Sequence, residues 1–199
     1  EHNDKPYILC EYSHAMGNSC GALHKYIEME DELPRYQGGF IWDFIDQGIS
    51  VQTAQGRTHL AYGGDFGDRP ADRQFCGNGL FFADRTESPK LQEVKFLYQP
   101  VRLYPSRSGV TLDNRQLFAD TSEYDLTWKL LRNGQSIADG RFPAPIVHAG
   151  EQARCAIDLP EFCADGEYVL HCALCYRDSR EWADTDYALM HGESIIEGK

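Results

Sequence analysis

The sequence predicts two parts, an α/β part over residues 1–100 followed by an all-β part over residues 101–199. In the first part, short apolar runs alternate with segments of helical periodicity, whereas in the second, strand-like runs are separated by turn dipeptides. With 199 residues the chain is long enough for one large domain or two small ones, and its 42% of hydrophobic residues is ordinary for a globular protein. We place the boundary at about residue 100.

The first part begins with a strand–helix–strand pattern. The nearly continuous apolar run Pro6–Cys10 is typical of a strand buried on both faces, as in a parallel sheet. A helix is expected next, with Asn18 or Ser19 as its N-cap and with Pro34 stopping it. The second strand is Phe40–Ile45, which completes one βαβ unit.

A long glycine-rich loop then runs from about Gly48 to Thr86. Loops of this length in compact domains are usually functional. Ser88 as N-cap and Pro89 at the first helical position predict a further helix that runs to Tyr98.

The second part reads as a series of short strands. The strand-like runs are 101–104, 110–112, 124–131, 153–157 and 168–176. The turn signals between them are Asn133–Gly134, Asp139–Gly140, Ala149–Gly150 and Asp165–Gly166. Strands at this spacing predict a β-sandwich.

Charge and hydropathy exclude several classes of partner. The formal net charge of −12 argues against binding to nucleic acid or to anionic membranes, which both require a basic face. The sequence contains no apolar run of about 18 residues, the length needed to span a membrane, and no recognisable signal peptide.

The cysteines indicate a reducing compartment. Their number is odd and their spacing irregular, which disfavours a disulfide framework; they are Cys10, Cys20, Cys76, Cys155, Cys163, Cys172 and Cys175. We therefore expect a cytoplasmic protein and leave the periplasm open. Cys172 and Cys175 form a C-x-x-C pair, but they lie in a predicted strand, where they point to opposite faces and cannot share a metal ion.

Three polar or aromatic residues are expected at one edge of the first part. Glu11 follows the first predicted strand, His14 comes three residues later, and Trp42 lies near the end of the second strand. Ligand sites of α/β folds gather at the carboxyl ends of the strands. An indole can stack on a sugar ring while a carboxylate and an imidazole hold its hydroxyl groups. From these residues alone, a structural ion pair, a loop histidine and a core tryptophan are open interpretations as well.

Three motifs favour the sugar site. The segment 8–19, ILCEYSHAMGNS, closely resembles the nucleophile signature of large β-galactosidases of the lacZ type, in glycoside hydrolase family 2. The segment 38–47, GGFIWDFIDQ, resembles the next barrel strand of that family, and 62–80 resembles its long active-site loop. The resemblance is close over residues 5–100 and loose beyond.

The resemblance implies a role for each of these residues. Glu11 matches the nucleophile, which forms a covalent galactosyl–enzyme intermediate in a retaining mechanism. His14 matches a residue that hydrogen-bonds galactose, and Trp42 matches the aromatic floor under the sugar. The acid/base glutamate lies in an earlier strand of the family, and no segment here matches it.

The resemblance also implies metal ions. Phe75, through its backbone carbonyl, and Asn78, through its side-chain oxygen, match a Na⁺ site, and hard cations prefer such oxygen ligands. Ala71 stands where some relatives have asparagine, which puts any further metal contact there in doubt. The Mg²⁺ ligands of the family lie upstream and have no match in this chain.

Taken together, the resemblance predicts the C-terminal portion of a TIM (β/α)₈ barrel followed by an immunoglobulin-like β-sandwich. A complete barrel needs roughly 250 residues and eight strands, so we expect a fragment that is inactive alone and that self-associates through its open edge. The expected substrate of the full enzyme is a β-galactoside such as lactose, and the full enzyme is expected to be a homo-oligomer.

Two alternatives stay open. Residues 100–199 could be a carbohydrate-binding sandwich, for which Trp128 and Trp182 are the available indoles. The first part could instead have a sister specificity, such as that of a β-glucuronidase or a β-mannosidase. A glucuronidase needs a cation for the uronate carboxylate, and no basic residue is added to the motifs described above.

Overall fold

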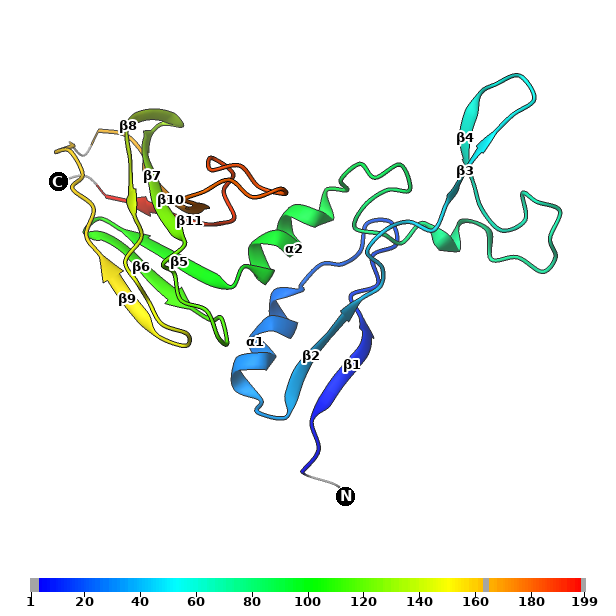
Figure 1. The fold of residues 1–199 in the computed structure, drawn as a ribbon, viewed down its shortest axis with the longest axis horizontal. Helices are drawn as coiled ribbons and strands as arrows, with labels where there is room; N and C mark the ends of the chain where they lie inside the picture. The colour runs from blue at the N-terminus through cyan, green and yellow to red at the C-terminus, as the bar shows by residue number, and fades with distance from the viewer. Residues whose placement is uncertain (1–3, 163–164, 198–199) are drawn as a thin grey trace. The chain divides into compact units, whose positions relative to one another are not determined.

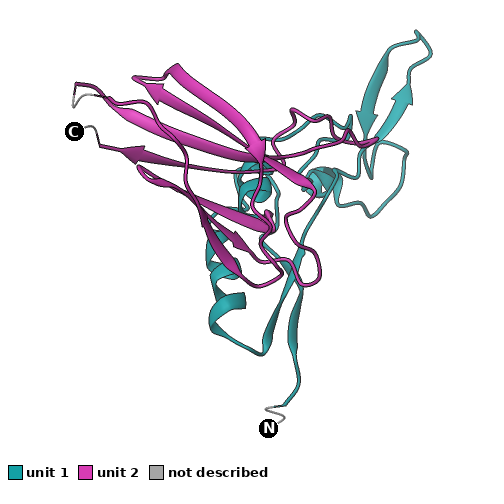
Figure 2. Ribbon diagram, turned by 60° about the vertical axis from the view of Figure 1, so that its left-hand side comes forward, with its two compact units in different colours: residues 1–97 teal, residues 98–199 magenta. Residues whose placement is uncertain are grey.

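The computed structural model describes residues 4–162 and 165–197 (Figure 1). The chain divides into two compact units, Glu1–Leu97 and Tyr98–Lys199 (Figure 2). No helix among the described residues is both long and apolar enough to cross a membrane.

Unit 1 contains the predicted strand–helix–strand pattern. Strand β1 (Tyr7–Tyr12) pairs in parallel with β2 (Tyr36–Ile41), and helix α1 (His24–Glu32) connects them and packs against β2 (Figure 1). Leu9 lies opposite Gly39, where an added Cβ would lie 2.8 Å from the Cβ of Leu9. Glycine at this position therefore allows the two strands to approach each other closely.

The bounds of these elements differ from the prediction. The predicted N-cap at Asn18 or Ser19 is wrong, because α1 begins only at His24 and its N-cap residue makes no side-chain cap hydrogen bond. The Ser19 hydroxyl instead donates to the backbone carbonyls of His14 and Met16, so it closes the loop after β1. The second strand lies earlier than predicted and ends at Ile41.

The predicted loop from Gly48 to Thr86 has structure of its own. It contains a hairpin of β3 (Ile49–Gln52) and β4 (Thr58–Ala61), and a short 3₁₀ helix, η1 (Arg73–Cys76). Each strand of the hairpin has only four residues and most of their side chains are exposed, so the sequence carries too short a pattern to predict them.

Helix α2 (Lys90–Tyr98) follows as predicted, but its start differs in detail. The amide of Leu91 donates to the backbone carbonyl of Ser88 (3.1 Å), whereas the buried Ser88 hydroxyl makes no hydrogen bond within the described residues. The predicted side-chain cap is therefore not formed.

The core of unit 1 is small. Its buried members come from β1, the loop after it, the approach to α1, and the region of α2; they are Tyr12, Ala15, Cys20, Leu23, Leu80 and Val94. The prediction that the first strand is buried on both faces is wrong for this chain, because Tyr7 is 57% and Ile8 55% exposed. The faces of parallel strands are normally covered by helices, and in the described part of unit 1 helix α1 packs against β2.

Unit 2 consists of two antiparallel sheets. The larger has the order β11–β10–β7–β8, formed by β7 (Tyr124–Arg132), β8 (Gln135–Pro143), β10 (Tyr168–Tyr176) and β11 (Met190–Ile196). The smaller has the order β5–β6–β9, formed by β5 (Val101–Ser106), β6 (Gly109–Asn114) and β9 (Gln152–Cys155). Both sheets contribute to one core, which includes Val101, Leu112, Leu126, Leu130, Leu170 and Met190.

Strands β8 and β11 were not among the predicted strands. The predicted Asn133–Gly134 turn is present and joins β7 to β8, with positive φ at both residues. The predicted turn at Asp139–Gly140 is wrong, because both residues lie within β8. Gly140 pairs with Trp128, and an added Cβ would lie 2.5 Å from the indole nitrogen, so glycine here makes room for the ring.

The C-x-x-C pair lies in β10, as predicted. Cys172 and Cys175 are both buried and both free, and burial raises the pKa of the Cys172 thiol to about 12. Within residues 4–162 and 165–197 no group of three or more His, Cys, Asp or Glu side chains could hold a metal ion. Cys163 lies outside the described residues.

Candidate active site

Unit 1 contains a cleft of about 650 Å³ at the carboxyl end of β1 and β2. All five candidate site residues from the sequence line it: Glu11, His14, Trp42, Phe75 and Asn78. The two strand ends supply Glu11 and Trp42, whereas Phe75 and Asn78 come from the end of the long loop. The structure thus brings together side chains that are up to 67 positions apart in the sequence.

Two backbone hydrogen bonds join the end of β1 to the end of β2. The amide of Trp42 donates to the carbonyl of Tyr12 (3.4 Å), and the amide of Ala15 donates to the carbonyl of Trp42 (2.6 Å). Ala15 is fully buried, which anchors the turn between these bonds. Glu11 and His14 are therefore held beside Trp42 by the backbone itself.

The polar and aromatic side chains of the cleft are accessible. Glu11 is exposed, His14 is half-buried, and the indole of Trp42 is 44% exposed. The ring of His14 lies 5.6 Å from that of Phe75, centroid to centroid. An accessible carboxylate, an imidazole and an indole on one wall are suited to a ligand that has both hydroxyl groups and an apolar face.

Asn78 and Phe75 form an oxygen-rich corner. Asn78 is only 1% exposed, and its amide nitrogen donates to the Phe75 carbonyl (3.0 Å). Its side-chain oxygen is buried and has no hydrogen-bond partner in the part of the chain that the structure describes. Because a 180° turn of the amide would place this oxygen beside the Phe75 carbonyl, the pair fits a hard cation such as Na⁺.

Asp43 and Asp46, to which the sequence assigned no role, hold the walls of the cleft. A carboxylate oxygen of Asp43 accepts from the Gln47 side-chain amide (2.7 Å), and one of Asp46 accepts from the backbone amide of Gly79 (2.6 Å). The backbone of Asp43 also receives the Leu80 amide (2.9 Å) and donates to the Asn78 carbonyl (2.7 Å). These bonds connect the end of β2 to the end of the loop.

The structure adds lining residues, of which only Ala71 had been singled out from the sequence. The added residues are Gln47 and, from the long loop, Gly63, Asp68, Ala71, Asp72, Arg73 and Cys76. Arg73 is the one basic residue among the described residues lining the cleft, which also contains three carboxylates. The only sequence signal for this group was the resemblance of the segments 38–47 and 62–80, because the path of an irregular loop has no periodicity.

The family model described as "Glycosyl hydrolases family 2, TIM barrel domain" matches residues 1–103. The chain belongs to glycosyl hydrolase family 2. A second model, described as "Beta-galactosidase, domain 4", matches residues 110–197. The family that the motifs suggested is thus confirmed.

Relatives within family 2 extend the likeness along the chain. A beta-galactosidase of Halalkalibacterium halodurans is 46% identical over 196 residues, which are 96% of this chain and 19% of the relative. One of Clostridium acetobutylicum is 46% identical over 197 residues, which are 98% of this chain and 22% of the relative. The chain spans about a fifth of the length of these curated relatives.

Solved structures show a weaker likeness. The exo-chitosanase CsxA of Amycolatopsis orientalis, in complex with PNP-beta-D-glucosamine, is 18% identical, with a TM-score of 0.39. The match covers 61% of this chain and 14% of the exo-chitosanase.

Proposed function

We propose that this chain is part of a retaining β-galactosidase in which Glu11 is the nucleophile. The observation that carries the proposal is the meeting of Glu11, His14 and Trp42 in one cleft, at the carboxyl end of a parallel strand pair. Membership of family 2 and the beta-galactosidase relatives support the choice of substrate.

The geometry suits a double displacement. The Glu11 carboxylate attacks the anomeric carbon while the bond from that carbon to the leaving oxygen breaks, and water later cleaves the galactosyl ester with net retention. Trp42 supplies a surface for the apolar face of the pyranose, and His14 donates a hydrogen bond to a sugar hydroxyl. Retaining enzymes place their second carboxyl group roughly 5–5.5 Å from the first, and we assign that group to a segment outside these residues.

In this proposal residues 1–100 are the C-terminal part of a TIM barrel, and residues 101–199 are an immunoglobulin-like β-sandwich that supports it. The chain alone is inactive because it has no residue matched to the acid/base group or to the Mg²⁺ ligands. Loss of a general acid alone lowers the rate by about 10²–10⁴-fold. The full enzyme is a homo-oligomer that acts on β-galactosides such as lactose.

The test is a chimaera in which this chain replaces the matching segment of the Halalkalibacterium halodurans relative. Glu11→Gln should lower kcat/KM for 4-nitrophenyl β-D-galactoside on the order of 10³-fold or more, since an amide cannot form the glycosyl ester. Glu28→Gln is the matched control, because Glu28 is exposed on α1 and does not line the cleft. Full activity of Glu11→Gln would contradict the proposal.

The same chimaera separates the sister specificities. We expect no turnover of the corresponding β-glucuronide or β-mannoside. Arg73 is a cation in the cleft, but it belongs to the motif that resembles the β-galactosidase loop and therefore does not favour a glucuronidase. Preferential hydrolysis of the glucuronide would assign Arg73 to the uronate carboxylate and overturn the galactoside proposal.

We further propose that the Asn78 side-chain oxygen and the Phe75 carbonyl bind Na⁺. A bound Na⁺ ion would supply a positive charge beside the sugar hydroxyl groups. Asn78→Ala in the chimaera should remove the dependence of KM on Na⁺ when K⁺ is exchanged for Na⁺, whereas Asn78→Asp, which keeps oxygen ligands, should retain it. An unchanged Na⁺ dependence in a folded Asn78→Ala variant would contradict this site.

A further inference from the structure

Unit 2 contains a second cleft, distant in sequence from the first. It has a volume of about 480 Å³ and lies in the segment that connects β10 to β11. Its lining includes the side chains of Arg180, Glu181, Trp182, Asp184, Asp186 and Tyr187. The core of unit 2 does not account for this combination of residues, because all six are exposed.

The indole of Trp182 lines this cleft and is exposed. Trp182 is 67% exposed, although tryptophan is normally among the more buried side chains. It lies at the tip of a tight turn closed by two backbone hydrogen bonds, from the Arg180 amide to the Ala183 carbonyl (2.8 Å) and from the Ala183 amide to the Arg180 carbonyl (3.3 Å). Ala183 is buried and anchors the turn.

The indole of Trp182 packs against Tyr176, which belongs to a small cluster of aromatic rings. Tyr176 meets Trp182 edge-on, with ring centroids 5.4 Å apart and an interplanar angle of 84°. Tyr176 in turn packs on Tyr124 at 5.3 Å, and the guanidinium of Arg180 lies 4.9 Å from the centroid of the Tyr176 ring. Trp182 is therefore fixed in place while it stays exposed.

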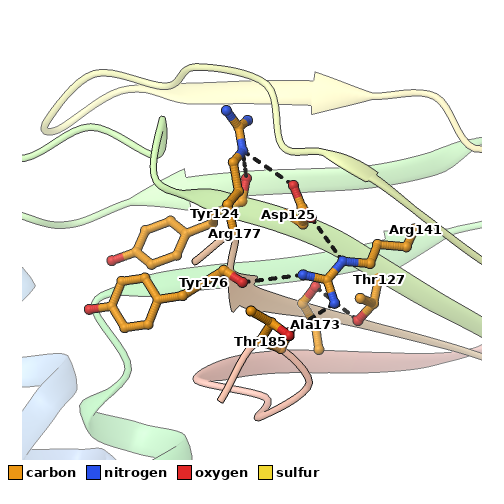
Figure 3. Close-up of polar contacts among 8 residues, drawn as sticks. All are labelled: Tyr124, Asp125, Thr127, Arg141, Ala173, Tyr176, Arg177 and Thr185. Atoms are coloured by element: carbon orange, nitrogen blue, oxygen red, sulfur yellow. Dashed lines mark hydrogen bonds and ion pairs between the residues drawn. The ribbon is translucent and has the colours of Figure 1, made fainter. Parts of the chain in front are cut away.

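Two arginines tie the connecting segment to the sheet (Figure 3). Arg141 donates to the backbone carbonyls of Tyr176 (3.2 Å) and Thr185 (2.8 Å), which are the two sides of the segment. Asp125 accepts from Arg141 (2.8 Å) and from Arg177 (3.2 Å). A segment held at several points loses little conformational entropy when it binds a ligand.

The chemistry of the cleft matches a neutral saccharide. The face of an exposed indole stacks on the apolar side of a pyranose, and carboxylates accept hydrogen bonds from its hydroxyl groups. The lining offers three carboxylates, of Glu181, Asp184 and Asp186, against the single cation of Arg180, which disfavours an anionic ligand.

We propose that the Trp182 cleft is a second, non-catalytic saccharide-binding site, and that it binds β-galactosides. The choice of β-galactosides rests on the function proposed for the first cleft. Such a site would hold substrate on unit 2 independently of Glu11.

The test uses the full 199-residue chain and its three tryptophans, Trp42, Trp128 and Trp182. In Trp42→Phe/Trp128→Phe the fluorescence comes from Trp182 alone, and in Trp128→Phe/Trp182→Phe it comes from Trp42 alone. Both variants are checked for folding by circular dichroism. Each protein, at micromolar concentration, is then titrated with lactose and with β-1,4-linked galacto-oligosaccharides. Sucrose is the control for solvent effects.

We expect the Trp182 emission to change saturably with lactose or the oligosaccharides and not with sucrose. In the variant whose fluorescence comes from Trp182 alone, Asp184→Asn and Asp186→Asn should each raise the fitted Kd at least about 5-fold, since each removes a charged hydrogen-bond acceptor. Glu151→Gln is the matched control, because it removes an exposed carboxylate elsewhere in unit 2 and should leave Kd unchanged.

A Trp182 emission that does not respond to any of the galactosides overturns the proposal, whatever Trp42 does. A change that follows protein concentration instead of sugar also overturns it and assigns the cleft to contacts between copies of the chain. The response of Trp42 separately reports on the first cleft, so failure of this site and failure of the proposed function give different results.

Discussion

The two units use similar amounts of chain in different ways. In unit 2, two sheets enclose one core in which Leu112, Leu126 and Leu170 are fully buried. In unit 1, a pair of parallel strands leaves Ile8 55% and Phe40 66% exposed. The two antiparallel sheets bury these leucines between them, whereas the parallel strand pair leaves Ile8 and Phe40 exposed.

This difference is informative because parallel sheets are normally covered on both faces. The apolar run Pro6–Cys10 has the sequence of a strand that is covered on both faces, but in the described part of unit 1 Tyr7 and Ile8 are more than half exposed. Its composition thus fits a larger sheet, while the candidate active site lies at the end of the same strand.

Cysteine reactivity should separate the units most strongly. Cys10 is exposed on β1, whereas burial raises the pKa of the Cys172 thiol from 9.0 to about 12. Because the thiolate is the reactive form, this shift alone lowers the reactivity of Cys172 on the order of 10³-fold. Alkylation with iodoacetamide at pH 8, followed by peptide mapping, measures both rates. Equal rates in the folded chain would contradict the burial of β10.

Truncation of apolar side chains should affect the units unequally. Leu170→Ala should lower the free energy of unfolding of unit 2 by about 2–5 kcal/mol, since it leaves a cavity between the sheets. Ile8→Ala should change the stability of unit 1 by less than about 0.5 kcal/mol, since Ile8 is largely exposed. Urea denaturation, followed by Trp128 fluorescence for unit 2 and Trp42 fluorescence for unit 1, gives both values. A large loss in Ile8→Ala would mean that β1 is covered in solution.

Self-association should depend on unit 1. The exposed apolar side chains of β1 and β2 predict that the isolated chain associates, and Phe40→Glu should lower its mass in light scattering towards that of the monomer. Ile137→Glu, an equivalent change at a 48% exposed position on β8, is the control and should have no effect. A monomeric unmodified chain, or equal effects of both changes, would contradict this prediction.

The smallest effect should be a pH dependence of unit 2. Burial on β10, with His191 and Lys129 nearby, lowers the pKa of His171, while Glu193 opposes this shift. A lowered folded-state pKa gives stability that is present above the unfolded pKa, about 6.5, and is lost as the pH falls below it. His171→Gln should reduce this loss of stability at low pH. The effect should be only about a fraction of a kcal/mol, because the half-buried imidazole is partly screened by water. Thermal unfolding between pH 5 and pH 8 measures it, and an unchanged slope would exclude His171 as the cause.

Much of the fold follows from the sequence, and the misses have physical reasons. The strands around Leu126 and Leu170 were predictable because both are long and rich in apolar side chains that the core buries. Strand β8 was missed because Gly140, which reads as part of a turn, lies under the Trp128 ring. Strand β11 contains Gly192, where an added Cβ would lie 2.1 Å from the carbonyl oxygen of Leu103, so close approach between the sheets also selects glycine there.

For the candidate site, too, some residues could be predicted from the sequence and others could not. Glu11 and Trp42 were predictable from their place at the carboxyl ends of strands, which meet at one edge of a parallel sheet. Asp68 and Arg73 lie in the segment that resembles an active-site loop, but their place in the cleft depends on the path of an irregular loop and could not be predicted. The exposure of Trp182 was equally hidden, since it depends on a turn held by Tyr176 and Ala183.

The most direct test of the central claim is to identify the residue that carries the covalent intermediate. The chimaera with the Halalkalibacterium halodurans relative is inactivated with a 2-deoxy-2-fluoro-galactosyl fluoride, digested, and read by mass spectrometry. We predict one galactosyl label, on Glu11. A label on another residue, or no label in a chimaera that still hydrolyses β-galactosides, would contradict the claim that Glu11 is the nucleophile.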